Sequence, residues 1–95
     1  MMHCLVETDL GRIADPDAAV TRLAQALLQL LDRQPDRALY SAACHTGAGR
    51  LTLSLDLAAA RLELASQDHA VAPDVWWDAP LDRLARAARG TGLAL

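Results

Sequence analysis

The segment that most constrains the fold is RLTLSLDL, residues 50–57, because every second side chain in it is a leucine. One side of the segment carries Leu51, Leu53, Leu55 and Leu57, and the other carries Thr52, Ser54 and Asp56. Such strict alternation predicts a β-strand with one covered side and one side that faces water, which antiparallel sheets allow. The rest of the chain must therefore supply a layer that packs on the leucine side.

A long amphipathic helix is predicted ahead of this strand, from Asp15 to about Gln34. Asp15 is typical of an N-cap, Pro16 suits the first helical position, and Pro35 follows the end. The apolar stripe consists of Val20, Leu23, Leu27, Leu30 and Leu31. The polar side consists of Arg22, Gln25, Gln29 and Arg33. A stripe of this width packs on a flat apolar surface.

Three further segments have strand patterns. Residues 37–44, RALYSAAC, lead into a glycine-rich HTGAG turn and are predicted to form a hairpin with residues 50–57. Residues 2–8, MHCLVET, are a candidate for an earlier strand. A third meander strand resumes the alternation, with Leu62 and Leu64 inward and Arg61 and Glu63 outward. A helix over residues 57–65 stays open as an alternative, because Ala, Leu, Arg and Glu are all good helix formers.

The C-terminal part is predicted as a loop, SQDHAVAP, then DVWW as a short strand or helix lead-in, and then a helix over about residues 79–89. Asp78 and Pro80 supply its start signals, and Gly90 ends it. Its expected inward residues are Leu81, Leu84 and Ala88, its outward residues are Arg83, Arg86 and Arg89, and Asp82 is spaced to pair with Arg86. The tail GLAL is a candidate edge strand.

This order of elements predicts one α+β domain over residues 1–95. We expect a two-layer sandwich, βαβββ(β)α(β), with a mostly antiparallel sheet and helices on one face. The alternative is a ferredoxin-like βαββαβ fold, in which residues 58–66 form no separate strand.

The later segments GRLTLSLDL, LELAS and PDVWWDAPLDRLARAARG resemble the meander, following strand and gating helix of sterol-carrier-like domains, including the small domains of mycothiol-dependent isomerases. The resemblance covers roughly residues 37–90 and is one of pattern. It implies binding of an apolar small molecule between the final helix and the sheet.

Charge and composition exclude several classes of protein. The formal net charge is −3 and the basic residues are scattered arginines, so no nucleic-acid partner is expected. No apolar stretch approaches the roughly 18 residues that span a bilayer, and the start MMHCLVETDL lacks the basic region of a signal peptide, so no membrane partner is expected. Two cysteines are too few for a disulfide framework, which favours a cytoplasmic location. The absence of Lys, Asn and Phe is typical of a high-GC bacterium.

Two dipeptides, His3-Cys4 and Cys44-His45, suggest metal or nucleophile chemistry. Neighbouring side chains of a strand point to opposite faces, so each dipeptide offers one ligand to a common site, which is too few for structural zinc. The same geometry keeps His45 from serving Cys44 as a base, unless the backbone bends at the turn. We therefore expect no metal and no cofactor, and Cys44, His45 and His69 are the candidate groups if the chain is a small enzyme.

The HTGAGR segment is interpreted as a hairpin turn and not as a phosphate loop. It lacks GxxxxGK, it joins two strands, and the chain contains no lysine. Three carboxylates, Glu7, Asp56 and Glu63, are predicted on the water-facing side of the sheet, where paired acids hold a cation or transfer protons if they lie close together. A contribution to solubility is the favoured explanation for all three.

Trp76 and Trp77 are adjacent in a chain whose other aromatic residue is Tyr40. Adjacent side chains face opposite ways in a strand and diverge by about 100° in a helix. One indole is therefore expected in the core. The other is expected to cap a sheet edge, cover a groove, or contact a second subunit or a ligand. Trp76, Trp77, Tyr40 and His69 are the predicted ligand- or partner-binding residues.

The functional hypothesis is a non-catalytic, cytoplasmic interaction module that self-associates as a dimer and serves a larger protein. The one-faced sheet, the small size and the second tryptophan motivate it. The alternatives are a binder of an apolar small molecule, which the sterol-carrier resemblance implies, and a small enzyme.

Overall fold

The computed structural model describes residues 5–47, 49–66, 74–76 and 80–89. Its elements are β1 (Leu5–Arg12), α1 (Pro16–Arg33), β2 (Leu39–Thr46), β3 (Gly49–Asp56), β4 (Arg61–Ser66), β5 (Asp74–Trp76) and α2 (Pro80–Ala88). The protein is thus a small α+β fold with a mixed sheet and a helix packed on it, which confirms the predicted class. No helix among these residues is both long and apolar enough to cross a membrane.

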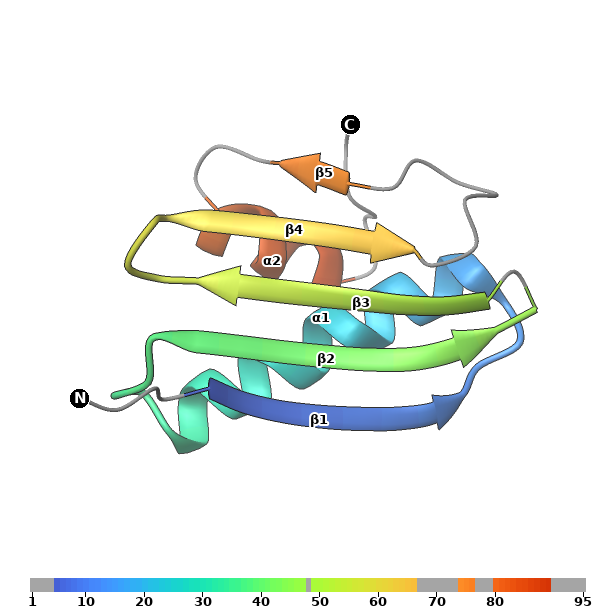
Figure 1. Ribbon diagram of the computed structural model, residues 1–95, viewed down its shortest axis with the longest axis horizontal. Coiled ribbons are helices and arrows are strands. Elements are labelled where there is room, and N and C mark those ends of the chain that lie inside the picture. Colours follow the sequence, from blue (N-terminus) through green and yellow to red (C-terminus); the bar gives the residue numbers. More distant parts are fainter. Residues whose placement is uncertain (1–4, 48, 67–73, 77–79, 90–95) are drawn as a thin grey trace.

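The strands follow one another across the sheet in chain order, from β1 at one edge to the three-residue β5 at the other (Figure 1). β1 runs parallel to β2, and the remaining neighbours are antiparallel. The β2–β3 hairpin is in register along its whole length, from Leu39 opposite Asp56 to Thr46 opposite Gly49. Gly49 has a φ of 116°, a conformation that favours glycine, so the predicted hairpin turn agrees with the structure.

Residues 2–4 of the predicted strand lie outside the described residues, and β1 extends to Arg12, past the predicted end at residue 8. It continues to Arg12 because Thr8 and Asp9 pair with β2, and because Gly11 adopts a φ of 78° where the pairing shifts register. A glycine in this left-handed conformation is typical of a β-bulge. The sequence pattern missed this extension, since it depends on pairing with a strand about thirty residues away in the chain.

Both helices lie on the same side of the sheet (Figure 1). α1 packs mainly on β2 and β3, while α2 packs on β4 and along α1. The Asp15 carbonyl accepts from the Ala19 N–H at 2.9 Å, which is the first helical hydrogen bond of an N-cap residue, as predicted. The Gln25 side chain donates to the Ala88 carbonyl at 3.0 Å and joins the two helices.

The core lies between the helices and the sheet. The strand leucines that alternation assigned to the covered side, Leu51, Leu53 and Leu55, are buried. From the helical side the buried residues are Ala19, Leu23, Ala24, Leu27 and Leu84. Val20, Leu30 and Leu31 of the predicted stripe pack against the core and are half-buried.

The structure decides two predictions for the C-terminal half of the chain. Residues 61–66 form strand β4 with Leu62 fully buried, so the helical alternative does not describe them. Leu81 was expected inward but is 50% exposed. It precedes the buried Leu84 by three positions, which places it about 60° around the helix from the face that contacts the core.

Candidate functional site

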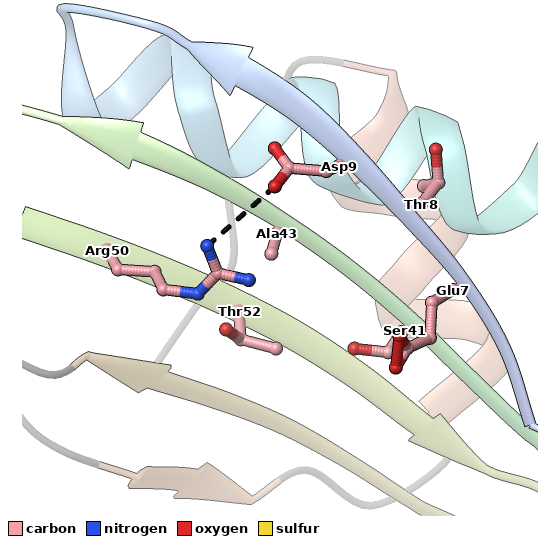
Figure 2. A pocket seen from close by; sticks show the side chains of 7 residues that line it. All are labelled: Glu7, Thr8, Asp9, Ser41, Ala43, Arg50 and Thr52. Carbon is pink, nitrogen blue, oxygen red and sulfur yellow. Dashed lines mark ion pairs between the residues drawn. The ribbon is translucent and has the colours of Figure 1, made fainter.

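The helix-free face of the sheet has a shallow hollow of about 440 Å³ over β1, β2 and β3 (Figure 2). Its lining residues are Glu7, Thr8, Asp9, Ser41, Ala43, Arg50 and Thr52. The depression forms because short side chains from β2 and β3 lie in the middle, while longer charged side chains stand around them. The period-2 alternation of the strands brings all of these side chains except that of Thr8 to one face.

Arg50 and Asp9 form an ion pair across the hollow, with 3.8 Å between the guanidinium and carboxylate atoms (Figure 2). The other carboxylate oxygen of Asp9 accepts from the Gly11 N–H at 2.8 Å, which orients the carboxylate at the bulge. The two side chains are 34% and 56% exposed, so water screens their attraction. The pair therefore shapes the hollow more than it stabilises the fold.

A row of basic side chains crosses three strands beside the hollow. Register places Arg12 opposite His45, and His45 opposite Arg50. The Nε2 of His45 lies 3.3 Å from an Arg50 guanidinium nitrogen. This contact links His45 to the guanidinium that also pairs with Asp9.

Cys44 lies on the opposite side of β2 from His45 and is fully buried. Burial raises the pKa of the Cys44 thiol, the charge of Asp9 raises it further, and Arg50 opposes the shift. The thiol is therefore protonated at neutral pH and has no access to solvent. The exposed His45 imidazole does not face it, which agrees with the strand geometry expected from the sequence.

Tyr40 lies in the core and not on the sheet face, with an exposed fraction of 1%. Its hydroxyl donates to the Gln34 carbonyl and accepts from the Arg37 N–H at 3.3 Å. This side chain thus joins β2 to the end of α1. The structure gives Tyr40 a packing role, and the sequence lacked a signal for it because strand alternation does not show that its hydroxyl reaches Gln34 at the end of the predicted helix.

The three predicted carboxylates share the helix-free face but do not converge. Glu7 and Glu63 occupy one cross-strand row with Ser41 and Ser54 between them, so they are three strand spacings apart, about 14 Å. Asp56 lies opposite Arg61 on the next strand. Within the described part of the chain, no group of three His, Cys, Asp or Glu residues is placed to hold a metal ion.

Several predicted site residues cannot be placed in this hollow. Trp77, His69, His3 and Cys4 lie outside the described residues. The backbone of Trp76 pairs with Glu63 in β5. The roles assigned to both tryptophans, and the apolar ligand that depends on them, stay predictions.

The sequence pattern missed Asp9 and Arg50 as site residues. A usable signal was present, because Asp9 continues the alternation of Leu5 and Glu7 once β1 is extended. Searches against protein-family models, curated proteins and solved structures found no match to this chain. The site is therefore interpreted from its own residues.

Proposed function

We propose that this protein is a non-catalytic interaction module that self-associates through the helix-free face of its sheet. One observation supports the proposal: α1 and α2 cover a single face, and the other face is hollowed, with short side chains in the middle of the hollow and charged side chains around it. In this view the fold is a two-layer sandwich whose open side receives a second copy. Short residues such as Ser41 and Thr52 let two sheets approach to the usual spacing of about 10 Å.

The size of the face is compatible with this role. Four strands about 4.8 Å apart and about eight residues long span roughly 19 Å by 26 Å, or about 500 Å² for each copy. Two such faces bury about 1,000 Å² in total, which is the lower limit for a specific interface. Self-association is therefore expected at micromolar concentrations and not at nanomolar ones.

The chemistry of the described residues favours binding over catalysis. Cys44 is buried and protonated, while His45 faces the other side of β2 and contacts Arg50. A nucleophile needs a base within hydrogen-bonding reach, and this pair lacks that arrangement. The Asp9–Arg50 pair supplies charges of both signs, which suits a polar protein surface.

Sedimentation velocity tests the proposal. We expect a dimer at tens of micromolar concentration and a monomer on dilution. Thr52→Arg places a long charged side chain in the middle of the face and should abolish the dimer. Gln29→Arg, on the exposed side of α1, makes a comparable change away from the face and should leave the dimer intact.

Circular dichroism of both variants checks that each remains folded. A chain that stays monomeric at every concentration refutes the proposal, and so does a dimer that tolerates Thr52→Arg. A dimer lost in both variants would place the interface elsewhere and would also refute it.

A further inference from the structure

β1 is the outermost strand of the sheet, and none of the described residues pairs with its outer edge (Figure 1). The backbone N–H and C=O groups on that edge are a template for pairing with another extended chain. The regular part of the strand runs from Leu5 to Asp9, because the register shift and the left-handed Gly11 interrupt it beyond that point. An added strand thus has about five residues of regular edge to pair with.

The two sides of β1 have different chemistry. The side toward the helix layer carries Val6, Thr8 and Leu10, which are half-buried because α1 packs mainly on β2 and β3. The helix-free side carries Leu5, Glu7 and Asp9, which are exposed. A strand laid against residues 5–9 would therefore meet Val6 and Thr8 on one side, and two carboxylates beside Leu5 on the other.

The negative charges of Glu7 and Asp9 are only weakly balanced by basic side chains of the described residues. Glu7 makes no ion pair with any residue that the structure describes, and Asp9 has Arg50 at the long distance of 3.8 Å. A residue directly opposite Glu7 on an added strand would bring its Cβ within about 5 Å. Cations at alternate positions of that strand would therefore be attracted, and anions repelled.

A second copy of this chain does not suit this edge. The antiparallel register that uses all five regular residues and keeps both helix layers on one side of a continuous sheet is centred on Glu7, and a shift toward the bulge centres it on Thr8. The register centred on Glu7 sets that residue opposite its own copy, and the register centred on Thr8 sets Glu7 opposite Asp9. Like charges directly opposite each other destabilise strand pairing.

We infer that the β1 edge binds an extended segment of a protein partner that carries Arg or Lys at alternate positions and apolar residues between them. The segment adds a strand to the sheet beside residues 5–9, with its cations on the side of Glu7 and Asp9. This inference rests on the proposed function as an interaction module, and it uses the backbone edge of β1 together with Glu7 and Asp9 at the rim of the hollow.

The test is an NMR titration of the isotope-labelled protein with a blocked peptide in which arginine and valine alternate. We expect amide shifts centred on residues 5–9 and slower hydrogen exchange of amides on the outer edge. A peptide of the same sequence with alternate N-methyl groups keeps its charges but cannot form the ladder, and it should not bind. Equal binding of the N-methylated peptide, or no binding of the parent peptide, overturns the inference.

Matched charge reversals locate the contact. Glu7→Lys should weaken binding by about fivefold or more, as expected for loss of one cross-strand charge pair. Glu63→Lys makes the same change on the same face, three strands away, and should leave the affinity within about twofold. Equal weakening by both variants would indicate general electrostatic attraction and would contradict docking at β1.

The Thr52→Arg variant separates this inference from the proposed function. Its substitution lies on β3, two strands from the β1 backbone edge and in the cross-strand row of Asp9, so the added cation should lower the peptide affinity while the amide shifts at residues 5–9 persist. Peptide binding without any dimer would refute self-association alone. A dimer without peptide binding would refute the edge inference alone.

Discussion

Replacing Tyr40 with phenylalanine removes one oxygen atom from a side chain that is 1% exposed, and it leaves the packing of the ring unchanged. The hydroxyl donates to the Gln34 carbonyl, which is one of the carbonyls left without a helical partner at the end of α1, and it accepts from the Arg37 N–H. The substitution therefore tests whether this contact holds the helix end to β2.

The expected cost follows from the two hydrogen bonds. Each contributes about 1 kcal/mol net, and both backbone groups lie where water reaches them in part, so we expect a loss of about 1–2 kcal/mol. For a domain of this size such a loss lowers the Tm by about 5–15 °C. With a urea m-value of about 1 kcal/mol/M, the midpoint should fall by about 1–2 M.

Urea unfolding followed by far-ultraviolet circular dichroism measures the change. Ser54→Ala removes one hydroxyl from the helix-free face and should alter the free energy of unfolding by less than about 0.5 kcal/mol. Hydrogen exchange should also quicken in the last turn of α1 of the Tyr40→Phe variant. A Tyr40→Phe protein as stable as the parent would show that the hydroxyl contributes nothing to the junction.

Three further changes test the core, the turns and the buried thiol. Leu84→Ala should lower the free energy of unfolding by about 2–5 kcal/mol, because Leu84 in α2 is fully buried. A urea titration that gives a loss of less than about 1 kcal/mol would contradict its place in the core. Ala60 has a φ of 54°, where a side chain is strained, so Ala60→Gly should raise the free energy of unfolding by about 0.5–1 kcal/mol. Gly11 has a φ of 78°, so Gly11→Ala should lower the free energy of unfolding by about 1 kcal/mol. Thermal unfolding that ranks the two variants the other way would contradict this reasoning. The raised pKa of Cys44 means that the folded state keeps its thiol proton longer than the unfolded chain, so its contribution is present below the unfolded pKa of about 8.5 and is lost as the pH rises through the folded pKa. Urea unfolding at neutral and alkaline pH should therefore show a steeper decline for the parent than for Cys44→Ala, and parallel declines would refute this coupling.

The parts of the fold that depend on neighbouring residues in the chain were predictable. The alternation in residues 50–57 correctly gave the covered side of β3, and the Asp15-Pro16 signal correctly gave the start of α1. Asp82 and Arg86 form the expected pair four residues apart, with 3.0 Å between their charged atoms. Each of these features is determined within one turn of helix or one strand.

The candidate site was not predictable in the same way, because it depends on pairing between distant segments. The hollow exists because the parallel register sets Asp9 beside Ala43, and the hairpin register then sets Ala43 beside Thr52. Neither register follows from the pattern of β1 alone, which is an edge strand with apolar and charged residues on its exposed side. Glu7, Asp56 and Glu63 were correctly predicted on one face, but their separation was not predictable for the same reason, since a shared face does not specify distance across it.

The two proposed surfaces are compatible with one another. A dimer formed face to face would place the β1 strands of both copies at its rim, so their outer edges would remain open to solvent. Such a dimer would present two docking edges, and a partner with two basic extended segments would bind more tightly than a partner with one. Self-association would therefore increase the affinity for a repeated or dimeric partner without any additional contact at either edge. The monomeric Thr52→Arg variant should still bind a single-segment peptide at residues 5–9, but it should bind a two-segment peptide no more tightly than a single-segment one.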